Sequence, residues 1–122
     1  MATVLIVDDD AATRLLVTTL LRHAGHTPIE ATNGAEGLSS AAEHQPDLIL
    51  LDLSMPSMSG PEFVRALRIA PQTRTTTVAL YTASPMNAML RDFMEMYGIE
   101  DVIPKPSEPS EFIDSVRQAL RE

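Results

Sequence analysis

The chain of 122 residues contains no cysteine, which excludes disulfides, thiolate catalysis and zinc sites with cysteine ligands. Long apolar runs are absent as well: none approaches the roughly 20 residues that a membrane-spanning helix requires. The N-terminus has no basic region followed by a long apolar stretch, so we expect no cleaved signal peptide. These absences fit a cytoplasmic protein that does not enter a membrane.

Basic residues are scarce, with 9 Lys and Arg against 17 Asp and Glu, and the net charge is −8. A protein that binds a phosphate backbone needs a basic face, so we expect no direct binding of nucleic acid by this chain. Hydrophobic residues make up 44% of the sequence, which is ordinary for a globular protein. The length predicts one domain over residues 1–122.

Five strand-like runs alternate with five helix-like segments. Apolar, β-branched runs such as TVLIV and DLILLDL are typical of strands buried on both faces. Strands are predicted at 3–7, 27–31, 47–53, 76–82 and 101–106, and helices at 11–25, 33–46, 59–71, 84–98 and 107–122. The alternation predicts an α/β fold, a flavodoxin-like (βα)5 three-layer sandwich whose parallel five-stranded sheet has the order 2-1-3-4-5.

Polar side chains stand where the predicted strands end. Asp8 and Asp9 follow the first strand, Asp52 ends the third, Thr82 ends the fourth and Lys105 ends the fifth. In such a sheet these ends meet at one edge, where ligands bind near the switch between strands 1 and 3. An ionised carboxylate inside the core would cost several kcal/mol. We therefore expect Asp52 at the mouth of a pocket and not in the core.

This set of residues suits phosphoryl chemistry. Three carboxylates at one site repel one another, which raises their pKa values. A divalent cation relieves the repulsion, and Mg²⁺, with Mn²⁺ as a substitute, takes one or two carboxylates and keeps waters for a phosphate-bearing partner. The ammonium of Lys105 and the hydroxyl of Thr82 can each bind a phosphoryl oxygen. Asp52 is the predicted nucleophile, which would become an aspartyl phosphate.

Four segments in order, VLIVDDD, LILLDLSMPSMSG, ALYTAS and DVIPKP, carry a family resemblance. Each is weak alone, but together they are very specific, and the chain resembles the receiver domain of two-component response regulators over essentially its whole length. The resemblance implies a sensor histidine kinase or phosphotransfer protein as phosphoryl donor and a downstream effector protein or domain. It implies a signalling domain, with only self-phosphotransfer and slow self-dephosphorylation as activity.

The resemblance also assigns roles to individual residues. Asp9, Asp52 and the backbone carbonyl of Ser54 would ligate Mg²⁺, and Asp8 would assist, mostly through water. Asp52 would accept the phosphoryl group, Thr82 would contact it and carry the switch, and Lys105 would bind one of its oxygens. The Lys105–Pro106 peptide is typically cis in the family. Arg14 stands where the family often has a basic residue, although a surface ion pair is an equal explanation.

The output is predicted on the face formed by the helix at 84–98 and the strands at 76–82 and 101–106, and a dimer through this face is left open. Val102 stands where the family usually has Tyr or Phe, so the usual two-residue relay is absent. Met89 and Met96 are interpreted as the edge of the core, with an adaptable partner-binding surface as the alternative. A single-domain regulator, a phosphorelay shuttle and a part of a longer protein all fit the sequence.

Two alternative functions share part of this residue pattern. A pseudo-receiver would bind partners without phosphorylation, but such chains usually lose one of the site residues, and none is lost here. A haloacid-dehalogenase-type phosphatase would need Asp-x-Asp-x-Thr after the first strand, where this chain has Asp8, Asp10 and Ala12. Asp10 is instead expected to cap the first helix.

Overall fold

Five strands and five helices alternate along the chain. The computed structural model describes all residues 1–122. The elements in order are β1 (Thr3–Val7), α1 (Ala11–His23), β2 (Thr27–Ala31), α2 (Gly34–His44), β3 (Leu48–Leu51), α3 (Gly60–Ile69), β4 (Val78–Thr82), α4 (Ala88–Tyr97), β5 (Asp101–Pro104) and α5 (Pro109–Ala119).

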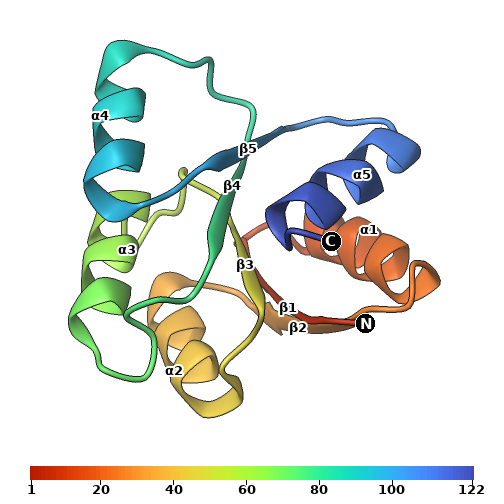
Figure 1. Cartoon of the computed structure of the whole chain (residues 1–122), viewed down its shortest axis with the longest axis horizontal. Coiled ribbons are helices and arrows are strands. Elements are labelled where there is room, and N and C mark those ends of the chain that lie inside the picture. The colour runs from red at the N-terminus through yellow and green to blue at the C-terminus, as the bar shows by residue number, and fades with distance from the viewer.

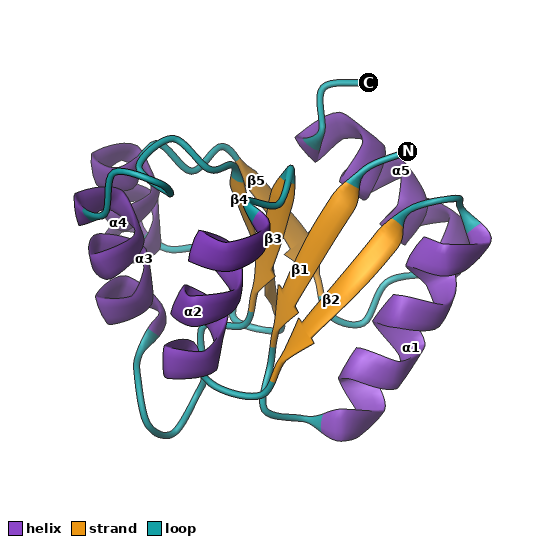
Figure 2. Ribbon diagram, turned by 90° about the horizontal axis from the view of Figure 1, so that it is seen from below, coloured by secondary structure: helices purple, strands orange, loops and turns teal.

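The strands form one parallel sheet in the order β2-β1-β3-β4-β5. Helices α1 and α5 cover one face of this sheet, and α2, α3 and α4 cover the other (Figures 1 and 2). The predicted α/β class, the three layers and the strand order are confirmed. All strands run the same way, so their carboxyl ends meet at one edge.

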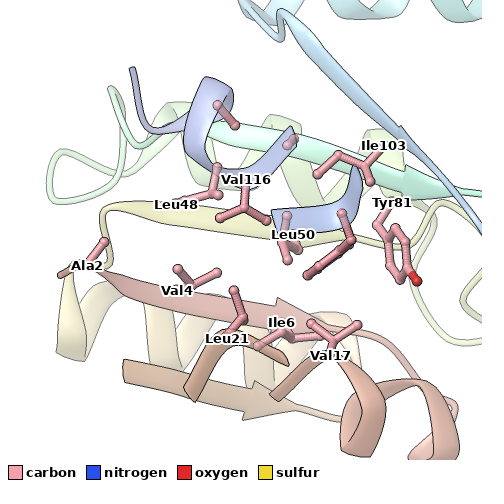
Figure 3. Packing of buried hydrophobic residues seen from close by; sticks show 13 residues of the cluster. Ala2, Val4, Ile6, Val17, Leu21, Leu48, Leu50, Tyr81, Ile103 and Val116 are labelled. Carbon is pink, nitrogen blue, oxygen red and sulfur yellow. The ribbon is translucent and has the colours of Figure 1, made fainter. Parts of the chain in front are cut away.

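Alternate residues of β1, β3 and β4 enter two separate cores, as the pleat requires. On the α1/α5 face, Ile6 and Leu50 pack with Phe112 and Val116 of α5 (Figure 3). On the other face, Val7 and its neighbours pack against α2 and α3. Because both of their faces are buried, these three strands consist almost entirely of apolar residues, which is the pattern the sequence shows.

Side-chain caps set the ends of several helices, and these helices are shorter than predicted. Asp10 caps α1 by accepting the Ala12 N–H, as expected. The helix predicted from 84 begins at Ala88, because the Asn87 side chain accepts the Leu90 N–H and ends the preceding loop. It ends at Tyr97, and the C-cap Gly98 has a φ of +70°, a left-handed conformation that glycine adopts without strain.

Helix α4 is the most loosely packed helix, since none of its residues is buried. Met89 is 82% exposed and Met96 is 74% exposed, so the interpretation of these two as the edge of the core is wrong. They lie on the solvent side of the apolar stripe of α4. The C-terminal end of α4 is held from α3, because the Arg68 guanidinium donates to the carbonyl oxygens of Tyr97 at 3.0 Å and Thr76 at 2.7 Å. None of the helices is long and apolar enough to span a bilayer.

Candidate phosphoryl-acceptor site

The backbone places the predicted site residues side by side at the carboxyl edge of the sheet. The Asp52 N–H donates to the Val7 carbonyl at 3.1 Å, directly before Asp8. The Lys105 N–H donates to the Thr82 carbonyl at 3.0 Å. Ile6 and Leu50 point into the core on the α1/α5 face. Asp8 and Asp52 follow them by two residues, so their side chains point toward the same face.

One ammonium lies between two carboxylates. Lys105 Nζ is 2.8 Å from Asp8 Oδ2 and 3.9 Å from Asp52 Oδ2. The Asp8 side chain is only 2% exposed, whereas that of Lys105 is 23% exposed. The other oxygen of Asp8 accepts the Asp10 N–H at 2.9 Å. Asp8 is thus held from two sides, and Lys105 keeps a path to solvent.

The carboxylates of Asp8, Asp9 and Asp52 form a group whose nearest oxygens all lie within 4.8 Å of one another. Three negative charges against the single positive charge of Lys105 leave two in excess, which a divalent cation would balance. Asp9 is exposed, so the group is open to solvent on that side. An oxygen-only, partly hydrated set of ligands is what Mg²⁺ prefers. The residues therefore fit a magnesium ion.

Asp52 is 9% exposed at the end of β3, beside the exposed Asp9. It is therefore more deeply buried than its expected place at the mouth of a pocket implies. Burial is the main reason why the pKa of Asp52 is raised, and the charges of Asp8 and Asp9 add to it. The hydrogen bond from the Ser54 N–H and the charge of Lys105 oppose this rise. Charge repulsion, the cause inferred from the sequence, is therefore the smaller effect.

Lys105 is held in its charged form. Burial by itself would lower the pKa of Lys105, but the hydrogen bond to Asp8 and the charge of Asp52 together raise it. The cation is therefore present at neutral pH and available to a phosphoryl oxygen. The Lys105–Pro106 peptide is cis, as the resemblance implied.

Thr82 is 4% exposed at the end of β4, and its hydroxyl oxygen accepts the Ser84 N–H at 3.0 Å. That bond uses an oxygen lone pair and leaves the hydroxyl proton to be donated.

Val102 is half-buried and packs against the core on the α2–α4 face.

Arg14 contacts the site and also forms an ion pair, so both explanations offered for this residue hold. Its Nη1 donates to the Asp8 carbonyl at 2.7 Å, and its Nε pairs with Glu30 at 3.1 Å.

Tyr81 also contacts the site, because Lys105 Nζ lies 5.2 Å from its ring centroid. Tyr81 was not among the predicted site residues, since an aromatic within an apolar strand is usually a core residue; its place directly before Thr82 was the available signal.

A parallel (βα)5 sheet with three carboxylates and a lysine at its carboxyl edge defines a receiver-type signalling domain. The family described as the response regulator receiver domain matches residues 4–117, and the chain belongs to this family. The chain is 33% identical to the polar-differentiation response regulator DivK of Brucella anthropi over 117 residues, which cover 96% of this chain and 94% of DivK.

Similar proteins differ in what accompanies the receiver domain. The chain is 34% identical to the phosphate regulon transcriptional regulatory protein PhoB of Pseudomonas aeruginosa, but the match covers 98% of this chain and 52% of PhoB. It thus spans about half the length of such relatives. Among solved structures, the chemotaxis protein CheY4 of Vibrio cholerae superposes with a TM-score of 0.90 at 30% identity, with 98% of both chains covered.

Proposed function

We propose that residues 1–122 form a single receiver domain that accepts a phosphoryl group on Asp52 in a magnesium-dependent reaction. The observation that carries this proposal is the convergence of Asp8, Asp9, Asp52 and Lys105 at one edge of the sheet, with two negative charges in excess. The proposed donor is a phosphohistidine of a sensor histidine kinase or of a phosphotransfer protein. A cytoplasmic location stays a prediction from the sequence.

In the proposed reaction an Asp52 carboxylate oxygen forms a bond to phosphorus as the phosphorus–nitrogen bond of the donor breaks. The electron pair of the broken bond goes to the donor imidazole nitrogen, so no oxidant or reductant is needed. Lys105 and the free hydroxyl proton of Thr82 would bind phosphoryl oxygens and offset their charge.

Asp9, Asp52 and the Ser54 carbonyl would hold Mg²⁺, with Asp8 assisting. When bound, the ion would neutralise charge on the transferring group. Asp8 and Lys105 form a close pair, with 2.8 Å between Oδ2 and Nζ. The chain's own contribution is therefore an ammonium held beside the carboxylates, where a phosphoryl oxygen would meet it.

Intact-mass spectrometry after incubation with phosphoramidate tests the proposal. A phosphoryl adduct should form with Mg²⁺, disappear in EDTA and disappear in Asp52→Asn. The matched control is Asp92→Asn, which changes an exposed carboxylate of α4 and should leave the adduct intact. An adduct that forms equally well in EDTA or in Asp52→Asn would refute the mechanism. No adduct on the wild type under any condition would favour a pseudo-receiver.

The proposed output face consists of α4, β4 and β5. Helix α4 buries none of its residues, so few contacts resist its movement. A cavity of about 240 Å³ joins the two site loops to its N-terminal end, with lining residues that include Leu53, Ser84, Met89 and Phe93. Movement of Thr82 toward the phosphoryl group would repack α4 into this space. This movement would change the positions of the exposed Met89 and Met96, and with them the surface that an effector or a second copy in a dimer contacts.

The phosphatase alternative has less support. Asp10, which would be its second catalytic carboxylate, caps α1 and accepts from Ala12 and Thr13. It is not part of the group formed by the other three carboxylates. The family relationship supports a signalling domain.

A further inference from the structure

Tyr81 precedes Thr82 in β4 and lies on the opposite side of the strand. Its ring belongs to the core on the α1/α5 face, which is also the face toward which Asp8 and Asp52 point. Figure 3 shows it at the edge of that core, with its oxygen pointing away from the labelled aliphatic side chains. The residue is 5% exposed. An aromatic ring therefore forms a wall of the proposed phosphorylation site.

The Lys105 ammonium lies over this ring, with Nζ 5.2 Å from the ring centroid. A cation within about 6 Å of an aromatic face is attracted by the negative charge of the π system, and the attraction grows as water is excluded. Two carboxylates, of Asp8 and Asp52, lie within 4.0 Å of the same nitrogen. The ammonium is thus bounded by the two carboxylates and by a ring that carries no net charge.

The ring itself is fixed in place. Phe112 of α5 meets it edge to face, with centroids 5.4 Å apart and planes inclined by 63°, a favourable arrangement for two aromatic rings. Phe112 is almost fully buried, so the pair cannot turn toward solvent without opening the core. The position of the ring is therefore set by the packing of α5 on the sheet.

The freedom of Lys105 lies in its side chain. Pro104 and Pro106 flank it and restrict the backbone, but four side-chain torsions remain and the side chain has a path to solvent. Asp8 would hold the ammonium less firmly if its carboxylate also assisted a metal ion. The Tyr81 ring is a contact that neither the metal nor the phosphoryl group competes for.

We propose that Tyr81 is a positioning residue, whose ring holds the Lys105 ammonium where an incoming phosphoryl oxygen meets it. The inference rests on the proposed phosphorylation of Asp52 and adds a residue from the hydrophobic core to that site. The ring provides the effect, and the phenol hydroxyl is not required. Tyr81→Leu should therefore be impaired, and Tyr81→Phe should behave as the wild type.

Two readouts test this. Lys105 is the only lysine of the chain, so selective lysine labelling gives one set of side-chain NMR signals. In the wild type and in Tyr81→Phe the Lys105 ε-protons should show an upfield ring-current shift, which Tyr81→Leu should lose. The rate of Asp52 phosphorylation by phosphoramidate in Mg²⁺ should fall about two- to fivefold in Tyr81→Leu, the size expected for one cation–π contact.

Tyr97→Leu is the matched control, because Tyr97 makes the same kind of edge-to-face pair with Phe93, at 5.6 Å and 61°, on the other face of the sheet. It should leave the phosphorylation rate and the Lys105 signals unchanged. If Tyr81→Leu does not fold, Tyr81→Met replaces it with the same expectations.

An unchanged rate and unchanged Lys105 shifts in the folded variant would overturn the proposal, as would a Tyr81→Phe variant as slow as Tyr81→Leu. The NMR readout needs no phosphorylation. A wild type that shows the ring-current shift but no adduct would therefore refute the proposed function while leaving the Tyr81–Lys105 contact established.

Discussion

The Lys105–Asp8 pair leads to a stability prediction that is independent of phosphorylation. Lys105→Met keeps an unbranched aliphatic chain and removes the ammonium. The Asp8 carboxylate, buried and 2.8 Å from Nζ in the wild type, would then keep only the hydrogen bond from the Asp10 N–H. A buried carboxylate without a cationic partner is strongly unfavourable. The metal-free variant should therefore be less stable than the metal-free wild type.

The magnitude follows from the burial of the two partners. Removing one member of a buried ion pair costs about 3–5 kcal/mol. Asp8 is buried, but the Lys105 side chain is 23% exposed and partly screened by solvent, so we lower the expected loss to about 2 kcal/mol. For a small domain this corresponds to a fall of about 1 M in the urea midpoint.

The reverse substitution should cost less. In Asp8→Asn the lysine still has Asp52 at 3.9 Å, and its long side chain can turn its ammonium toward water. The double variant Asp8→Asn/Lys105→Met has no unpaired charge at this position, so it should be more stable than Lys105→Met alone. This order distinguishes an unpaired buried charge from a simple loss of packing.

Urea unfolding followed by circular dichroism, near neutral pH in EDTA, measures these differences. The same experiment with saturating Mg²⁺ should recover more stability in Lys105→Met than in the wild type, since a bound cation replaces the lost positive charge. A Lys105→Met midpoint equal to that of the wild type in EDTA would contradict the reasoning. A double variant no more stable than Lys105→Met would contradict it as well.

Two further predictions concern the acidic site and the output face. Burial raises the pKa of Asp52 above its ordinary value of 3.8, so the folded state holds this proton more tightly than the unfolded state. In EDTA, the stability of the wild type relative to Asp52→Asn should therefore fall as the pH rises from about 4 through the raised pKa. Thermal unfolding across this range checks it, and a relative stability of the wild type that increases with pH would be inconsistent. Beryllofluoride, a mimic of the phosphoryl group, should shift backbone amide NMR signals of residues 84–102 as well as those around Asp52. Shifts confined to the site loops would show that the α4–β4–β5 face is not the output.

The fold class, the strand order and the set of polar residues at the carboxyl edge could all be predicted from the sequence. The reason is that each of these depends on local pattern: apolar runs that alternate with amphipathic helices, and polar residues placed directly after the runs. The topology of a parallel sheet brings Asp8, Asp52 and Lys105 together, so their proximity can be predicted without knowing how the side chains pack. The cap of α1 by Asp10 is local in the same sense.

The packing of these side chains and helices could not be predicted from the sequence and is known from the folded structure. The burial of Asp52 and the exposure of Met89 both depend on how neighbouring segments pack around them. The choice of Asp8 as the close partner of Lys105, and the place of the Tyr81 ring beneath the same ammonium, depend on contacts between residues far apart in the chain. A periodic pattern specifies which face of an element is apolar, but it does not specify which atoms of two elements meet, and the chemistry of this site is set by those contacts.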